Sequence, residues 1–239
     1  MPEPASKIIA IVPAKDAAPS IAATVEALAA TGTLAEVVVV DDGSSDTTAQ
    51  DAARAGARVV ALPRNLGKAG AVAAGIAAAD DADVYLLVDA DTGASASAAL
   101  SLLAPVLSGD ADLVIGVLPS AGKKAGFGLV NETARRGIRA ACGYEAVRPL
   151  SGQRAVRGPL LRSLRLAPRY GMEVSMTVDA VRRGARVVEI PVEMTHRHTG
   201  RSLRGFAHRA RQGLDVVLPL IPRLIRRGRT VVRTEGAAR

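Results

Sequence analysis

Six short runs of apolar, mostly β-branched residues alternate with Ala-rich segments of helical length, and this alternation constrains the fold more than any other feature. Near-continuous apolar strands separated by helices indicate a parallel sheet that is buried on both faces. We therefore predict an α/β protein with a doubly wound, Rossmann-like sheet. The expected strands are 8–12, 37–40, 58–62, 84–88, 112–117 and 186–192. The expected helices are 18–31, 46–56, 68–80, 96–107, 123–141, 172–184 and 203–218.

Positive charge gathers at the C-terminal end of the chain. Residues 196–239 contain eleven arginines and two acidic residues, a net charge of +9 in a chain whose total is +8. The length of 239 residues suits one large α/β domain, which we place at 1–200. Residues 201–239 are predicted to form a basic, amphipathic helical tail. Three roles for the tail stay open: a solvated surface, attraction to anionic lipid headgroups, and binding of a phosphorylated acceptor.

Several classes of protein fit this sequence poorly. Three Tyr, two Phe and no Trp leave few platforms for stacking single-stranded nucleic acid, and no helix-turn-helix or zinc spacing favours duplex binding, so we expect no nucleic-acid partner. No apolar run reaches the roughly 18–20 residues that span a bilayer, and the first residues lack a secretory signal. The single cysteine, Cys142, cannot form an internal disulfide. We expect a cytoplasmic protein and leave open peripheral contact with the inner face of the membrane.

Charged residues follow four consecutive expected strands. The blocks are PAKD at 13–16, DDGSSD at 41–46, PRNLGK at 63–68 and DAD at 89–91. In open α/β sheets, ligands bind beyond the carboxyl ends of the strands, so the four blocks converge on one edge. Helix capping could account for any one block, but four together favour a binding site.

Other phosphate-binding folds fail on spacing. The segment after the first strand, IVPAKDAAPS, has no glycine and so cannot be a dinucleotide fingerprint. Gly67-Lys68 is followed by Ala69 and has no glycine five positions earlier, which excludes a P-loop. A phospho-acceptor receiver domain would account for only about half of the chain.

Asp89 and Asp91 are two positions apart at the end of a strand, so both side chains can point the same way. Paired carboxylate oxygens suit Mg²⁺ or Mn²⁺ that is bound together with a substrate diphosphate. Such an ion neutralises the charge that builds on a departing phosphate. The pair therefore predicts a metal-assisted reaction at a diphosphate.

Together the four blocks resemble the nucleotide-sugar half of GT-A family 2 glycosyltransferases, and the resemblance covers at least residues 7–195. It implies a GT-A fold, a mostly parallel sheet with helices on both faces, with a nucleotide-sugar half at 7–117 and an acceptor half at 118–200. It also implies that the D-x-D segment holds the metal and the diphosphate, with Asp91 as catalytic residue and metal ligand. The implied contacts to the nucleotide sugar, usually a uridine nucleotide, are Pro13, Ala14, Asp16, Asp41, Asp42, Gly67, Lys68, Asp89 and Ala90.

The second half resembles the acceptor half of glucosyl-3-phosphoglycerate synthases and, more loosely, polyprenyl-phosphate sugar transferases. The matching segments are PLSGQRA at 149–155, YGMEV at 170–174 and THR at 195–197. The resemblance implies that His196 is a second metal ligand. The implied acceptor contacts are Ser151, Gly152, Gln153 and Arg154. Two departures bear on the acceptor: Gln153 stands where glutamate is usual, and His198 stands where asparagine is usual.

Glu173 opens an expected helix, where the helix dipole favours a carboxylate. A functional interpretation is a catalytic base or a carboxylate that positions the acceptor hydroxyl. Both interpretations stay open at this point.

The sequence thus predicts a metal-dependent glycosyltransferase that moves a hexose from a nucleoside diphosphate sugar, with UDP as the expected carrier. The acceptor is expected to be a phosphorylated small molecule or a polyprenyl phosphate, with Mg²⁺ or Mn²⁺ as cofactor. Retention and inversion at the anomeric carbon both stay open, as does a homodimer. The alternatives are a sugar nucleotidyltransferase, which normally carries a Gly-rich basic loop after its first strand, and a non-catalytic sensor of sugar nucleotides.

Overall fold

The computed structural model describes residues 6–79, 81–119, 127–168 and 171–194, together with Leu220 and Arg223. These residues contain a seven-stranded sheet with the order β3-β2-β1-β4-β6-β5-β7. The strands are β1 (Ile8–Ala14), β2 (Glu36–Asp41), β3 (Arg58–Ala61), β4 (Val84–Leu87), β5 (Leu113–Val117), β6 (Arg154–Arg157) and β7 (Val187–Pro191). The helices are α1 (Ala18–Ala29), α2 (Thr48–Arg54), α3 (Gly67–Ala78), α4 (Ala104–Leu107), α5 (Phe127–Cys142), α6 (Gly158–Ser163) and α7 (Gly171–Arg182).

The sheet is mostly parallel, as expected. Strands β1, β2, β3 and β4 pair in parallel, and β5 pairs in parallel with β7. The exception is β6, which lies antiparallel between β4 and β5. Strand β6 was not predicted from sequence, because its four residues, RAVR, begin and end with arginine and form no continuous apolar run.

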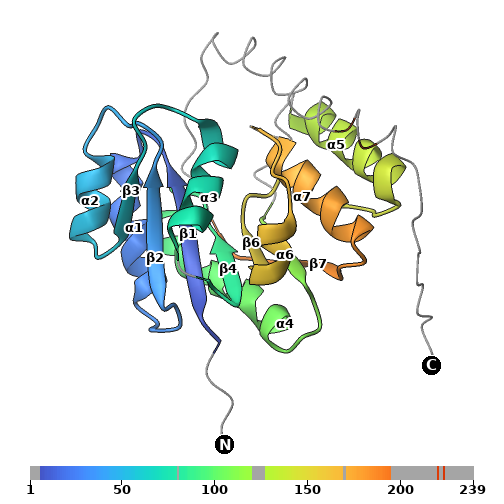
Figure 1. The fold of residues 1–239 in the computed structure, drawn as a ribbon, viewed down its shortest axis with the longest axis horizontal. Helices are drawn as coiled ribbons and strands as arrows, with labels where there is room; N and C mark the ends of the chain where they lie inside the picture. The colour runs from blue at the N-terminus through green and yellow to red at the C-terminus, as the bar shows by residue number, and fades with distance from the viewer. Residues whose placement is uncertain are drawn as a thin grey trace, which may run out of the picture.

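Alternate residues of each central strand face two separate apolar layers, and helices cover both faces of the sheet (Figure 1). On one face, Ile8, Ala10 and Val12 of β1 pack with residues of α1 and of the 3₁₀ helix η1 (Gly93–Leu103). On the other face, Ile9 and Ile11 pack with residues of α3, α6 and α7. Helices on both faces confirm the predicted layer arrangement, and they explain why the strands are apolar throughout.

The expected α-helix at 96–107 is instead the 3₁₀ helix η1 followed by the short α4. Ser95 and Ser101 each donate a side-chain hydrogen bond to the carbonyl three residues earlier, at 2.7 and 2.8 Å. Such local bonds compete with regular α-helical geometry, and the segment holds the tighter 3₁₀ turn. The presence of a helix in this segment was predicted correctly, and its 3₁₀ geometry was not specified from sequence.

Two residues of the expected tail are described, and both contact the domain. Leu220 is buried among residues of α5 and α7, and Arg223 forms an ion pair with Asp179 of α7. The expected helix at 203–218 and the domain boundary at 200 lie outside the described residues, so both stay predictions. In the described part of the chain, no helix is both long and apolar enough to cross a membrane.

Candidate active site

The loops after β1 and β2 are joined by hydrogen bonds. Asp16 accepts from the Ser45 backbone N–H at 2.8 Å and from the Ser45 hydroxyl at 3.1 Å, and its own N–H donates to Ser44 Oγ at 2.9 Å. The bonds from Ser45 lower the pKa of Asp16 below its usual value. Asp16 also has a positive φ of 49°, which is uncommon outside glycine. The loops after β1 and β2 are therefore linked at one edge of the sheet, and the ionised Asp16 carboxylate is part of that link.

Asp41 is the last residue of β2, Asp42 follows it, and both are buried. Asp41 accepts a hydrogen bond from the Ser44 N–H at 3.0 Å. Asp42 accepts from the N–H groups of Leu66 and Gly67, at 2.6 and 2.9 Å. Asp42 thus fixes the N-terminus of α3 against β2, and contact of either carboxylate with a nucleotide stays a prediction.

Lys68, in the first turn of α3, lies between two carboxylates. Its Nζ is 2.6 Å from Asp89 Oδ1 and 3.0 Å from Glu173 Oε1. Burial lowers the pKa of Lys68, but the charges of Asp89 and Glu173 outweigh burial and raise it above the usual value. Lys68 is therefore a fixed cation at neutral pH, and it connects the nucleotide-sugar half predicted from sequence to the acceptor half.

Asp89 has a second partner that the sequence analysis assigned elsewhere. Gln153 Nε2 donates to Asp89 Oδ2 at 2.9 Å, and the Asp89 N–H donates to Gln153 Oε1 at 3.2 Å. Both oxygens of the Asp89 carboxylate are thus engaged, Oδ1 by Lys68 and Oδ2 by Gln153. Gln153 was predicted to contact the acceptor, and the structure places its side chain against the D-x-D segment.

Asp91 differs from Asp89 in being exposed. β4 ends at Leu87, so the alternation of strand side chains does not extend to Asp91. The turn between the two aspartates is held by the Ala90 carbonyl, which accepts from the hydroxyls of Ser20 at 2.9 Å and Thr24 at 3.1 Å. Asp91 therefore lies on a turn that these two hydrogen bonds hold in place.

The residues present fit a Mg²⁺ or Mn²⁺ site that is completed by a ligand. Asp91 supplies a hard carboxylate oxygen at the expected edge. Among the described residues, no group of three His, Cys, Asp or Glu side chains is arranged to hold a metal. His196, the second predicted ligand, lies outside the described residues. A substrate diphosphate would have to supply other oxygens, as the sequence analysis expected.

Glu173 lies in the first turn of α7 and is buried. Its Oε1 binds Lys68, whereas Oε2 has no hydrogen-bond partner within the described residues; the same holds for the buried Ser151 Oγ. An unsatisfied buried polar atom is destabilising by about 1–3 kcal/mol. Contact of Glu173 Oε2 or Ser151 Oγ with a ligand stays a prediction.

Arg154 is the first residue of β6, and it is fully buried. Its guanidinium donates to the carbonyls of Ser151 and Pro149 and to Thr177 Oγ1, at 2.9, 3.3 and 3.1 Å. Burial lowers the pKa of Arg154. Arg154 thus holds the backbone of residues 149–151 in place through hydrogen bonds. Contact of Ser151, Gly152 and Arg154 with an acceptor stays a prediction.

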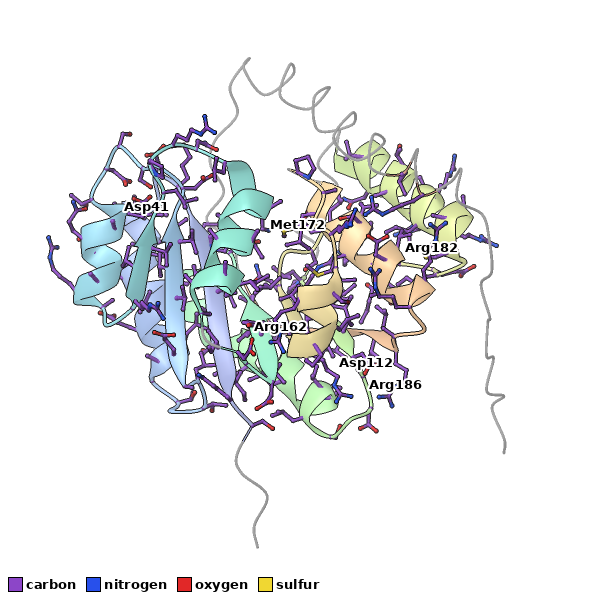
Figure 2. The ribbon with its side chains drawn as sticks, viewed as in Figure 1. Asp41, Asp112, Arg162, Met172, Arg182 and Arg186 are labelled. Carbon is purple, nitrogen blue, oxygen red and sulfur yellow. The ribbon has the colours of Figure 1, made fainter. Side chains whose placement is uncertain are left out.

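Figure 2 labels two residues near the candidate site, Asp41 and Met172, and the two members of a charged pair, Asp112 and Arg186. Asp41 of β2 and Met172 of α7 lie toward the same end, whereas Asp112 and Arg186 lie at the opposite end. Asp112 Oδ2 accepts from the Arg186 N–H at 2.8 Å. The charged pair at the opposite end is therefore remote from the predicted site.

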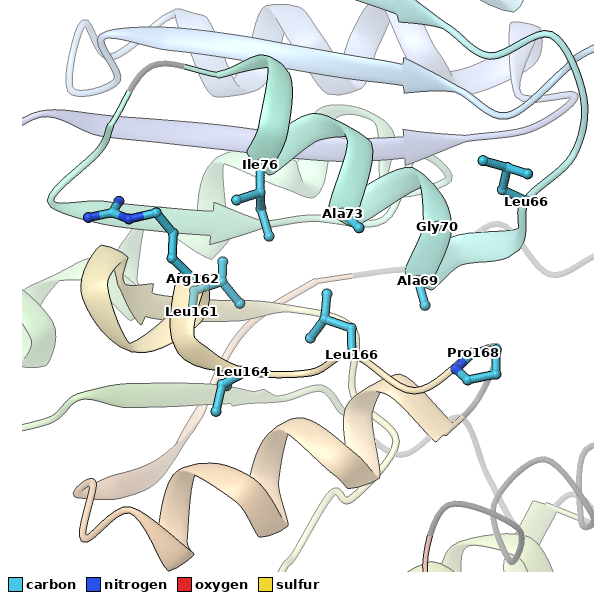
Figure 3. A pocket seen from close by; sticks show the side chains of 10 residues that line it. All are labelled: Leu66, Ala69, Gly70, Ala73, Ile76, Leu161, Arg162, Leu164, Leu166 and Pro168. Carbon is cyan, nitrogen blue, oxygen red and sulfur yellow. The ribbon is translucent and has the colours of Figure 1, made fainter.

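An apolar groove of about 420 Å³ runs between α3 and α6 (Figure 3). Arg162 is its one charged lining residue, and it donates to the Ala82 carbonyl at 3.0 Å. None of the residues predicted from sequence to bind donor, metal or acceptor lines the groove. The groove is lined by Leu66, Ala69, Gly70, Ala73, Ile76, Leu161, Arg162, Leu164, Leu166 and Pro168.

Known proteins of one family are similar to this chain in sequence. Residues 9–154 match the family model for glycosyl transferase family 2. The glucosyl-3-phosphoglycerate synthase of Mycolicibacterium paratuberculosis is 30% identical over 199 residues, which cover 74% of this chain and 60% of that protein. The chain thus spans about three fifths of the length of this relative.

Solved structures of a second synthase share the fold. Glucosyl-3-phosphoglycerate synthase from Mycobacterium tuberculosis, in complex with Mn²⁺, uridine diphosphate and phosphoglyceric acid, is 27% identical with a TM-score of 0.76. That match covers 92% of this chain and 78% of the other. The same synthase with Mg²⁺ and uridine diphosphate is 26% identical with a TM-score of 0.78, covering 92% and 79%.

Proposed function

The chain belongs to glycosyl transferase family 2, and from this premise we propose that it transfers a hexose from a UDP-sugar to a phosphorylated small molecule. The reaction would require Mg²⁺ or Mn²⁺. The observation that carries the proposal is the Lys68 ammonium, held between Asp89 and Glu173 at the edge where all four charged blocks meet. The metal-bound uridine diphosphate in related synthases supports the same donor.

For binding the donor, the chain has the Lys68 ammonium, which the carboxylates of Asp89 and Glu173 hold in place. An ammonium carries three N–H donors, and within the described residues Asp89 and Glu173 accept two of them. The third donor is then available to the sugar nucleotide. Because these groups are held in place before the ligand arrives, little reorganisation accompanies binding.

Asp91, with His196 as its proposed partner, would hold the metal. A bound Mg²⁺ or Mn²⁺ neutralises negative charge that develops on the leaving diphosphate. Glu173 would act from α7 by accepting a hydrogen bond from a sugar or acceptor hydroxyl at Oε2, the oxygen left without a partner among described residues. Glu173 thus orients a reacting hydroxyl.

Phosphoglyceric acid in a related synthase supports a small phosphorylated acceptor for this chain. A polyprenyl phosphate is the alternative acceptor, and it would accord with contact between the Arg-rich tail and an anionic membrane. Homodimer formation is a further proposal that activity alone does not test. The two acceptors differ in size and solubility, so one assay separates them.

The test uses the full chain with UDP-glucose and Mn²⁺, and it measures UDP release and the sugar product. Phosphoglyceric acid, glycerol 3-phosphate and a polyprenyl phosphate in detergent are compared as acceptors. We expect sugar transfer to a small phosphate ester and none after removal of the metal with a chelator. Release of pyrophosphate from a sugar 1-phosphate and UTP would instead identify a nucleotidyltransferase, and donor binding without turnover would identify a sensor.

A further inference from the structure

We propose that Gln153 is a positioning residue for the donor, which it serves by fixing Asp89, and not a contact to the acceptor. The inference rests on the proposed function, because it assigns Gln153 to one side of that reaction. It departs from the sequence analysis, which placed Gln153 with the acceptor contacts.

The two hydrogen bonds between Gln153 and Asp89 have opposite polarity. Gln153 Nε2 donates to the Asp89 carboxylate, and Gln153 Oε1 accepts from the Asp89 backbone N–H. A neutral amide provides one donor group and one acceptor group, which an ionised glutamate cannot do, since its two oxygens only accept. Gln153 therefore fixes both the backbone and the side chain of Asp89.

The position of Gln153 is itself determined by its surroundings. Its side chain is fully buried, and its carbonyl accepts from the Gly116 N–H of β5 at 2.9 Å. A Cβ atom on Gly116 would lie 3.2 Å from the Gln153 Cβ, so the two segments pack closely. A side chain anchored in this way holds its partner without further loss of rotamer freedom.

Gly152 contributes to the same contact. A Cβ atom at this position would lie 2.5 and 2.7 Å from the two carboxylate oxygens of Asp89, and closer still to Lys68 Nζ. Any side chain here would displace the Lys68–Asp89 pair. Two neighbouring residues of one segment thus act on the same ion pair, Gly152 by leaving room for it and Gln153 by orienting it.

The test measures donor and acceptor binding separately in the variant Gln153→Met, which keeps the side-chain volume and removes both hydrogen bonds. Losing two hydrogen bonds to a charged partner predicts about a tenfold weaker binding of Mn²⁺–UDP by calorimetry. The KM for UDP-glucose should rise, while the KM for the acceptor stays within about twofold. Gln50→Met, an exposed position in α2, is the matched control and should behave as wild type.

A second variant keeps the inference testable if Gln153→Met does not fold. Gly152→Ala should also weaken Mn²⁺–UDP binding, and Gly128→Ala, where an added Cβ meets no atom within 4 Å, is its control. A rise in the acceptor KM alone, or unchanged donor binding in folded Gln153→Met, overturns the role of Gln153 while leaving the proposed function intact. If the wild-type chain itself binds no Mn²⁺–UDP, the proposed function and this inference both fail.

Discussion

Lys68 Nζ and Glu173 Oε1 are 3.0 Å apart, although their residues lie in opposite halves of the chain. Lys68 lies in the first turn of α3, which follows β3, and Glu173 lies in the first turn of α7, which precedes β7. The ion pair can therefore form only when α3 and α7 are both packed against the sheet. Lys68, Asp89 and Glu173 thus form one charged cluster that connects the two halves of the chain predicted from sequence.

Replacing Lys68 by Met removes the cation between two carboxylates and should lower the free energy of unfolding by about 2 kcal/mol at pH 7, a value reduced for the partial exposure of the pair. Because the pKa of Lys68 is raised in the folded state, its stabilising contribution is complete below the unfolded value of 10.5. The contribution is lost as the pH rises through the folded value.

Urea unfolding of wild type and Lys68→Met between pH 7 and 11 checks this prediction. The difference in unfolding free energy should be constant up to about pH 10 and shrink above it. A difference that grows with pH would contradict the assignment of Lys68 as the charged partner.

Asp112 joins β5 to β7 at the end of the molecule remote from the site (Figure 2). Burial raises the pKa of Asp112, but hydrogen bonds from Arg186 outweigh burial and lower it below the usual 3.8. Its stabilising effect is therefore present above that value and is lost as the pH falls through the folded pKa. Asp112→Asn should lower the melting temperature at pH 7 by a few degrees, with unchanged Mn²⁺–UDP affinity. A loss of affinity in this variant would show that the remote end of the sheet controls the site.

Of the two proposed metal ligands, Asp91 lies within the described residues and His196 does not. Asp91→Asn should nearly abolish Mn²⁺-dependent UDP binding, since it removes the exposed carboxylate at the end of β4. His196→Ala should weaken Mn²⁺ binding, and His198→Ala is the control that should change it little. Titration of the three variants with Mn²⁺ in the presence of UDP measures each effect. If His198→Ala alone weakens binding, the wrong histidine has been assigned.

Arg223 pairs with Asp179, with its Nε 2.8 Å from Asp179 Oδ1, so this arginine is engaged within the protein. Truncation after Arg223 keeps that contact and removes the five arginines beyond it. We expect the shortened chain to lose binding to anionic vesicles at 0.05 M salt, because its tail charge falls, and to keep its melting temperature. Vesicle flotation checks the prediction; equal binding of both chains would remove the distal arginines from any lipid contact.

Most of the fold could be predicted from sequence, because buried parallel strands carry a continuous apolar signal such as VVVV at 37–40. The edge where the site lies followed from the charged blocks after those strands. β6 could not be found this way, since RAVR carries neither an alternating nor a continuous apolar pattern. Missing β6 also hid the pairing of Gln153 with Asp89, which are 64 positions apart and meet only because β6 runs beside β4.

We expect the cluster of Lys68, Asp89 and Glu173 to bind a metal-bound uridine nucleotide. Calorimetric titration of UDP-glucose into wild type and Lys68→Met, with Mn²⁺ and with a chelator, tests it most directly. We predict binding to wild type only with Mn²⁺, and at least about tenfold weaker binding to the variant, whose fold is checked by circular dichroism. Binding that is equally tight without the metal, or unchanged in folded Lys68→Met, would contradict the account.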